Sequence, residues 1–311
     1  MKKIISQCIF YIRNHTLLKI IAYKLLYSWR KDASKKQGHK IKAVFRYPVD
    51  LENPRSFNEY ILWLKRNYRN NQWKECADKL KCKDFLKRNG FEKYLPKTLA
   101  IYDSSSQIDL SNLPNKFVLK TNHDCGSVYI CEKGKTNFGK VFKSIDKSLK
   151  QSYYSESDEW VYEDIEPKIY AEEYLEPKNG KDLNDFKLFT FDGKYRFGYY
   201  SANRSKDVRF QLFENDFDIV NCDYSHLRPG KKYTISKPDE FPELVRLAEQ
   251  VGQHFNFVRV DLYLTTQGIK LGELTFLAMS GFGQFIDYQY DFKYGKCFES
   301  SSIGDMVKKQ K

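Results

Sequence analysis

Two carboxylates and an arginine in the C-terminal third form the pattern with the clearest chemistry. The runs FVRVDLYL (257–264) and IKLGELTF (269–276) are β-like and are joined by a short turn. In such a hairpin Asp261 and Glu273 can sit opposite one another, with Arg259 two residues away on the same face. Facing carboxylates repel unless a cation separates them, and oxygen ligands that share phosphates suit Mg²⁺. The pattern predicts a magnesium site beside an arginine that stabilises developing negative charge; the alternative is a cross-strand pair on a solvated face.

A second pattern, KFVLKTNHDCGSVYIC at residues 116–131, is a strand, a polar turn and another strand. Lys120 on the first strand can face phosphates, while Gly126, Ser127 and nearby backbone amides can close over them. An ordinary hairpin with a surface lysine fits the same letters. The Walker motif is absent, so any phosphate site here is of another type.

A third pattern, IYAEEYLEP at residues 169–177, is an apolar strand that runs into two carboxylates, an aromatic residue and a leucine. In a nucleotide cleft, such a segment can offer backbone groups to adenine and an apolar wall to its face. It equally fits an edge strand that Glu172 and Glu173 protect from further pairing.

Helical and β-type patterns that position these residues alternate along the chain. Apolar spacing predicts helices after Asn53 and Pro54, over about residues 74–89 with an end at Gly90, and over residues 239–255. Short β-rich runs fill most of the chain from Lys116 onward. The fold class is therefore α+β.

The net charge of +13 is concentrated at the N-terminus, where residues 1–45 hold eleven Lys or Arg against one acid. The rest of the chain is nearly neutral, which argues against a nucleic-acid partner. Residues 17–30 are predicted to form a basic amphipathic helix, and residues 33–42 a linker. The helix fits the anionic inner leaflet of a membrane and equally fits packing on the protein's own body.

Cysteine usage and the N-terminal segment bear on the compartment. Seven scattered cysteines without a C-x-x-C pair predict neither a disulfide framework nor a zinc site. Basic residues interrupt each candidate membrane span, and no small-residue cleavage site follows the start. We expect a cytoplasmic protein, with the inner face of the cytoplasmic membrane as a peripheral location.

At these residues the sequence resembles the ATP-grasp superfamily, and more closely its TupA-like branch, found among genes for capsule and other surface-polysaccharide assembly. The resemblance covers most of residues 52–295, in NPRSFNEYILWLK, ADKLKCKDFL, LPNKFVLKTNHDCGS, EWVYEDIEPKIYAEEYLE, DFKLFTFDGK, FVRVDLY, GELTF and YDFKYG. It implies two α+β lobes with a nucleotide cleft between them. The expected divisions are a basic segment at 1–45, a helical region at 46–115, a small lobe at 116–176 and a large lobe at 177–311.

The resemblance implies roles for the phosphate-binding side of the cleft. Lys83 and Lys120 match the two basic residues that hold ATP phosphates, and Lys120 also counts as catalytic. The turn from His123 through Gly126 to Ser127 looks like the loop that closes over them. Closure of such a loop excludes water from a hydrolysable intermediate.

Further roles follow for adenine, ribose and metal. Asp185 matches the acid that binds ribose, and Arg259 resembles the arginine that stabilises phosphoryl transfer to a carboxylate. Asp261 and Glu273 resemble the magnesium ligands. The adenine hinge is matched by Glu172, Glu173, Tyr174 and Leu175.

Three positions depart from the usual pattern. Many ATP-grasp ligases have Asn two residues after the second acidic ligand, whereas Thr275 stands here as a poorer candidate metal ligand. Asp124 lies in the phosphate loop, where an acid is unfavourable unless it points away. Lys187 can compensate by facing the phosphates, or can be a surface lysine.

The resemblance implies an ATP- and Mg²⁺-dependent carboxylate–amine ligase that works through an acyl phosphate. The expected partners are ATP, an acidic sugar or polysaccharide precursor, and an amine donor. A kinase acting on a sugar hydroxyl, a glycosyltransferase of the same pathway and a nucleotide-binding scaffold without turnover remain open alternatives.

Overall fold

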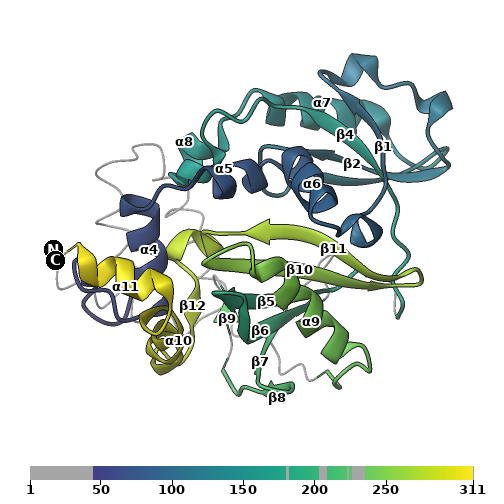
Figure 1. The fold of residues 1–311 in the computed structure, drawn as a ribbon. Helices are drawn as coiled ribbons and strands as arrows, with labels where there is room; N and C mark the ends of the chain where they lie inside the picture. Colours follow the sequence, from purple (N-terminus) through teal and green to yellow (C-terminus); the bar gives the residue numbers. More distant parts are fainter. Residues whose placement is uncertain (1–44, 180–181, 203–208, 223, 226–234, 311) are drawn as a thin grey trace, which may run out of the picture.

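The computed structural model describes residues 45–179, 182–202, 209–222, 224–225 and 235–310, and it contains both helices and sheets (Figure 1). The predicted amphipathic helix and linker before residue 45 lie outside the described residues. Two sheets dominate the fold, one of four strands and one of six, and the predicted α+β class is confirmed. Helices α5 (Asn71–Ala77) and α6 (Lys79–Arg88) lie between the two sheets.

The four-stranded sheet has the order β1-β4-β2-β3, and all its neighbours are antiparallel. Helix α7 (Phe138–Leu149) covers its outer face, where Phe117 and Leu119 are fully buried. The strands are β1 (Thr98–Tyr102), β2 (Lys116–Thr121), β3 (Val128–Glu132) and β4 (Ile169–Glu173). Strand β1 comes from the segment 46–115, so that segment contributes a strand to this sheet as well as helices.

The six-stranded sheet has the order β11-β10-β5-β6-β7-β8. Helix α9 (Phe241–Gly252) lies within the helix predicted over residues 239–255 and packs on one face through Leu244, Leu247 and Val251. The strands are β5 (Asp185–Phe191), β6 (Lys194–Ala202), β7 (Arg209–Glu214), β8 (Asp218–Ile219), β10 (Phe257–Thr265) and β11 (Gly268–Thr275). A small separate sheet joins β9 (Tyr224–Ser225) to β12 (Gln284–Phe285).

The opposite face of the six-stranded sheet is apolar at one end and charged at the other. Phe57 from α4 (Phe57–Asn67) packs edge-on against Phe189 and Phe197 at the apolar end. Helices α10 (Gln289–Glu299) and α11 (Ser302–Lys309) complete this cover. Because side chains alternate along β10, the same face that buries Phe257 carries Arg259 and Asp261. The aromatic core therefore borders the charged row directly.

The helix predicted over about residues 74–89 is wrong as a single element. The chain breaks at Asp78, whose carboxylate accepts hydrogen bonds from the backbone N–H groups of Leu80 and Lys81 and so caps α6. The same carboxylate accepts from Asn122 Nδ2 at 3.0 Å, at the end of β2. The break is thus fastened to the four-stranded sheet.

A buried carboxylate joins α4 to α10. Asp291 accepts hydrogen bonds from Tyr47 Oη at 2.6 Å and from the Asn58 backbone N–H and side-chain amide at 3.0 and 2.7 Å. Burial raises the pKa of Asp291 to about 6 despite these donors. Ionised Asp291 is therefore less favourable in the folded protein than in the unfolded chain.

This pKa predicts a pH-dependent loss of stability. The contribution of Asp291 is fully present below its unfolded pKa and is lost as pH rises through the folded value of about 6. We expect wild type to lose up to about 3 kcal/mol relative to Asp291→Asn between about pH 4 and pH 7. Urea unfolding of both proteins across that range measures the difference, and parallel pH profiles would contradict it.

Candidate active site

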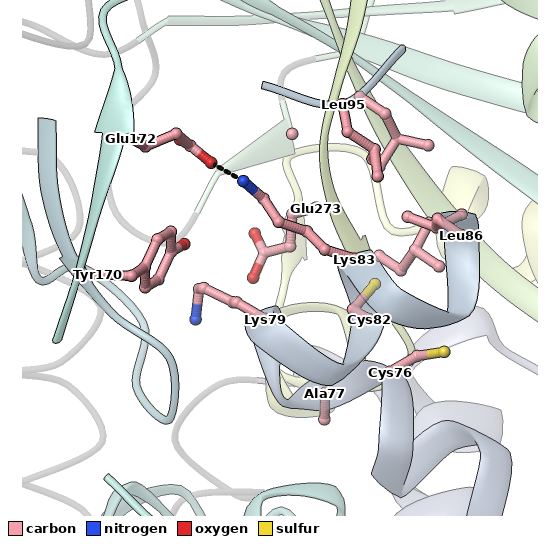
Figure 2. Close-up of a pocket in the computed structure, with 13 residues that line it drawn as sticks. Cys76, Ala77, Lys79, Cys82, Lys83, Leu86, Leu95, Tyr170, Glu172 and Glu273 are labelled. Carbon is pink, nitrogen blue, oxygen red and sulfur yellow. Dashed lines mark ion pairs between the residues drawn. The ribbon is translucent and has the colours of Figure 1, made fainter. Parts of the chain in front are cut away.

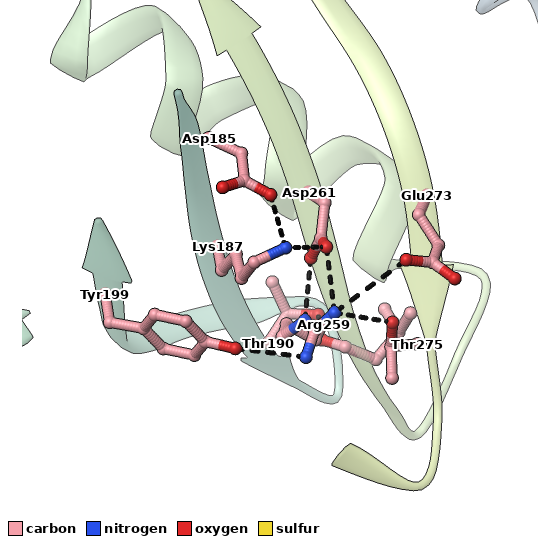
Figure 3. Close-up of polar contacts among 9 residues, drawn as sticks. Asp185, Lys187, Thr190, Tyr199, Arg259, Asp261, Glu273 and Thr275 are labelled. Atoms are coloured by element: carbon pink, nitrogen blue, oxygen red, sulfur yellow. Dashed lines mark hydrogen bonds and ion pairs between the residues drawn. The ribbon is translucent and has the colours of Figure 1, made fainter. Parts of the chain in front are cut away.

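Asp261 is the centre of the charged row on the six-stranded sheet (Figure 3). Arg259 Nε and Nη2 lie 2.7 and 2.8 Å from its two carboxylate oxygens, in a bidentate pair. The Lys187 ammonium contacts Asp261 and lies 2.5 Å from Asp185 Oδ2. Burial alone would raise the pKa of Asp261, but Arg259 and Lys187 outweigh it and hold that pKa below its usual value. The carboxylate is thus kept ionised.

Glu273 completes the predicted carboxylate pair. It is the cross-strand partner of Asp261 in the β10–β11 hairpin, as the sequence predicts, and its carboxylate lies 4.0 Å from Arg259 Nη2. The register shifts between Asp261 and Leu262, so that Gly272 is an extra residue in β11. A Cβ at Gly272 would lie 2.3 Å from the Tyr263 ring. Glycine therefore lets the tyrosine lie against the strand next to Glu273.

A second acid-centred cluster lies on the inner face of the four-stranded sheet. Glu172 pairs with Lys83 and Lys120, each at 2.5 Å, and is 3% exposed. Burial alone would raise the pKa of Glu172, but the two lysines hold it below its usual value. Lys83 also donates to Pro96 O and Thr98 Oγ1, at 2.8 and 2.9 Å. These contacts occupy all three donor positions of Lys83, so a phosphate would have to replace one of them, and the phosphate-binding role of Lys83 stays a prediction.

The β2–β3 turn is built by its own polar side chains. His123 is buried, and its Nε2 lies 3.1 Å from the Ser148 carbonyl oxygen at the end of α7. Thr121 Oγ1 lies 2.5 Å from the Asp124 carboxylate, which also accepts from the Ser127 hydroxyl. Asp124 is therefore turned toward the loop's own hydroxyls. Gly126, at φ 110°, adopts a conformation that favours glycine.

Lys79 is a cation that the sequence reasoning missed. Its ammonium contacts the Asp124 carbonyl oxygen, and its backbone N–H donates to Asn122 O at 3.2 Å. It is the first residue of α6, directly after the capping Asp78. The available signal in the sequence was a helix-capping acid, Asp78, followed directly by a lysine. Because Asp78 is hydrogen-bonded to Asn122 at the β2–β3 turn, the first residue of α6 lies beside that turn.

The predicted hinge and ribose residues are divided between the two sheets. Glu173 accepts from the Lys97 backbone N–H at 2.8 Å, and Leu175 is buried after the end of β4. Tyr174 stacks under the Lys116 ammonium at 3.5 Å. Asp185 is fully buried on β5, and its Oδ2 lies 2.5 Å from the Lys187 ammonium, so its role in binding ribose stays a prediction.

One cleft lies between the two clusters (Figure 2). It is lined by α5, α6, β4 and β11. Lys79, Lys83 and Glu172 line it from one side and Glu273 from the other. Tyr170, which the sequence reasoning also missed, lines it two residues before Glu172. The cleft brings residues of both sheets to a single site.

No group of three or more Asp, Glu, His or Cys side chains suited to a metal occurs in the part of the chain that the structure describes. The Thr275 hydroxyl, a predicted metal ligand, instead accepts a hydrogen bond from Arg259 Nη2 at 2.8 Å. Asp261 and Glu273 are the two carboxylates of this site that could hold a cation, and Thr275 as a metal ligand stays a prediction. A hard cation held by two carboxylates needs further oxygens from a phosphate or from water, which is typical of Mg²⁺.

A family model described as TupA-like ATPgrasp matches residues 59–299. The chain belongs to the TupA-like ATP-grasp family. The matched range contains both sheets and both acid-centred clusters. No curated protein matches the sequence. Within the described residues of this TupA-like chain, no helix has the length and apolar character needed to cross a membrane.

Solved structures give more distant likenesses. A D-alanine–D-alanine ligase from Bacillus anthracis in complex with ATP is 17% identical with a TM-score of 0.38, over 65% of this chain and 54% of that one. An L-amino acid ligase from Bacillus licheniformis is 12% identical with a TM-score of 0.42, over 78% and 55%. The TupA-like chain thus spans about half the length of these ligases.

Glu172 predicts a stability effect. Glu172→Gln leaves two largely buried ammonium groups without their shared carboxylate, so we expect a loss of about 2–4 kcal/mol. Glu176→Gln is the matched control, because Glu176 forms an exposed ion pair with Lys116 at 3.3 Å. We expect this control to change the free energy of unfolding by about 0.5 kcal/mol or less. Denaturant unfolding measures both, and equal losses would contradict the structural role of Glu172.

The bulge predicts a second effect. Gly272→Ala places a methyl group against the Tyr263 ring, so we expect a loss of about 1–3 kcal/mol. Adding Tyr263→Ala should remove most of the penalty that Gly272→Ala imposes. Gly139→Ala on α7 is the control, since its nearest contact is an ordinary 3.6 Å. A fully stable Gly272→Ala protein would show that the tyrosine does not need this space.

Proposed function

We propose that the chain is an ATP- and Mg²⁺-dependent carboxylate–amine ligase that modifies a cell-surface polysaccharide or its precursor. The observation that carries the proposal is the pairing of Asp261 with Glu273 beside Arg259, across one cleft from Lys79 and Lys83 of α6. Two carboxylates can hold a metal ion, and the lysine ammonium groups opposite them can hold phosphates. Together they form a site suited to a metal-bound triphosphate.

In this proposal the phosphates lie between the β2–β3 loop and the charged row around Asp261 on the six-stranded sheet. Lys120 and Lys79 would contact them, because Lys79 lines the cleft and reaches the loop carbonyl, whereas the donors of Lys83 are used by Glu172, Pro96 and Thr98. Lys83 then positions Glu172. The segment from Glu172 to Leu175 would receive adenine, and the backbone and hydroxyl of Ser127 would close over the phosphates together with His123 and Gly126.

The carboxylate pair fits Mg²⁺. Asp261 and Glu273 would hold the ion, which when bound would neutralise charge on the phosphates. Lys187 has Asp185 as a second acceptor at 2.5 Å, so Asp261 can release an oxygen to the ion without leaving that lysine unpaired. The Arg259 guanidinium keeps its contacts with the Tyr199 and Thr275 hydroxyls, at 3.1 and 2.8 Å, and stays aimed at the site.

The proposed reaction has two steps. A carboxylate oxygen of the acceptor attacks the γ-phosphorus and ADP leaves, which gives an acyl phosphate. An amine then attacks the acyl carbon, forms the amide and expels inorganic phosphate. Arg259 and Lys120 would stabilise the transferring phosphoryl group, and the closed β2–β3 loop would exclude water from the acyl phosphate.

The TupA-like resemblance supports a surface-polysaccharide substrate. A uronic acid or an acidic amino acid would supply the carboxylate, and an amino acid or amino sugar the amine. We place the enzyme in the cytoplasm, where ATP is supplied. Contact of residues 1–45 with the inner leaflet is part of this proposal, but residues 1–44 lie outside the described structure.

Product analysis separates the proposal from its rivals. Purified protein with ATP, Mg²⁺, an oligouronate and an amine should release ADP and phosphate and form an amide detectable by mass spectrometry. A kinase would leave the phosphate on the sugar. A scaffold would release no ADP in response to acceptor, and either result would overturn the ligase proposal.

Glu273 gives a site-specific prediction. Glu273→Gln should lower kcat by about 100-fold or more, because a metal ligand and its charge are removed, and should raise the Mg²⁺ concentration needed for half-maximal rate. Its side chain is 27% exposed, so the fold should persist. Exposed Glu299→Gln is the control for charge loss. Unchanged Mg²⁺ dependence in Glu273→Gln would remove this residue from the metal site.

A further inference from the structure

Helix α7 has two faces of opposite character. Its apolar face, with Phe138, Phe142 and Ile145, packs on the outer face of the four-stranded sheet. The opposite face carries four exposed lysines at spacings of three, four and three residues, which places them in one row: Lys140, Lys143, Lys147 and Lys150. The row is about 15 Å long at the helical rise per residue.

These four lysines are not neutralised by neighbours. Among the described residues, none of them forms an ion pair with a carboxylate. The one acid of the helix, Asp146, accepts a hydrogen bond from Ser105 Oγ at 2.8 Å on another side. Like charges at helical spacing destabilise a helix. The packed apolar face offsets that cost here and leaves a row of cations free for an external anion.

The row leads to the proposed active site. The C-terminal end of α7 contacts the β2–β3 loop, where His123 Nε2 lies 3.1 Å from Ser148 O and the Ser127 and Ser148 hydroxyls are 2.9 Å apart. Lys150, the last lysine of the row, caps the helix two residues after Ser148. A linear anion held along the row would therefore have one end beside the loop.

We propose that the lysine face of α7 binds a linear, carboxylate-bearing polysaccharide chain and guides its end toward the β2–β3 loop. The identity of the chain rests on the proposed function; the binding surface rests on the charge row. A single convex row fits a linear polymer better than a flat bilayer, and the exposed face of α7 carries no aliphatic side chain for insertion. Its phenylalanines pack toward the sheet, so it lacks the exposed aromatic residues on which nucleic-acid bases stack.

The test measures binding of the full chain to polygalacturonate, with neutral dextran as the comparison. One variant replaces the row by glutamine: Lys140→Gln, Lys143→Gln, Lys147→Gln and Lys150→Gln. The matched variant removes the same charge from exposed lysines on α6, β6, α10 and α11: Lys87→Gln, Lys194→Gln, Lys296→Gln and Lys309→Gln. Both keep the basic segment 1–45, so only the position of the lost charge differs.

We expect the row variant to bind polygalacturonate at least about tenfold more weakly, and the matched variant to stay within about twofold of wild type. Equal losses in both variants, or wild-type binding equal to that of dextran, would overturn the proposal. It would also fail if the row variant lost affinity for phosphatidylserine vesicles or oligo(dT) and kept its affinity for polygalacturonate.

Catalysis separates this inference from the proposed function. With a single uronic acid as acceptor, too short to reach the row, the row variant should release ADP at the wild-type rate, whereas its KM for a long polyuronate should rise. Row-dependent polymer binding without ADP release for any acceptor would overturn the ligase function and leave the binding surface standing. If the row variant released ADP and its KM for the long polyuronate were unchanged, the binding surface would be overturned and the ligase function would stand.

Discussion

The site depends on keeping buried carboxylates ionised, and the chain does this by sharing each one between two cations. Asp261 is held by Arg259 and Lys187, and Glu172 by Lys83 and Lys120. A buried carboxylate without such partners would take up a proton and lose its value as a cation ligand. Arg259 precedes Asp261 on the same strand, but the other three partners come from a neighbouring strand or from α6, so both clusters depend on the folded sheets. The catalytic electrostatics and the fold are therefore one requirement.

The aromatic core explains why the charged row can be rigid. Phe57, Phe189 and Phe257 fill the same sheet face a few residues from Arg259, and α9 covers the reverse face. Strand β10 is thus packed on both sides and paired on both edges, with β5 and with β11. Side chains that project from such a strand have little freedom. This rigidity would preorganise Arg259 for the proposed stabilisation of charge on the transferring phosphoryl group.

Much of this was readable from sequence, and the exceptions have physical causes. The predicted pairing of Asp261 with Glu273 is present, but alternation and the two-residue turn do not produce it by themselves, because a regular register after that turn would set Asp261 opposite Gly272. Only the unpaired Gly272 brings Glu273 into place, and an isolated glycine in a strand was its signal. The split at Asp78 was missed because apolar spacing continues across it. The binding of Lys83 by Pro96 O and Thr98 depends on contacts that spacing cannot reveal.

The joint between α5 and α6 touches both sides of the cleft. Asp78 and Lys79 are fastened to Asn122 at the end of β2, while Trp73 in α5 stacks on Phe276, directly after β11, at 4.9 Å. Helices α5 and α6 therefore contact both the four-stranded sheet and the end of β11. Movement of the loop over a nucleotide would pull on these helices, and the indole of Trp73 would feel the change in its surroundings. If the two halves close over a nucleotide, the fluorescence of Trp73, which stacks on Trp160 and Phe276, would change with that closure.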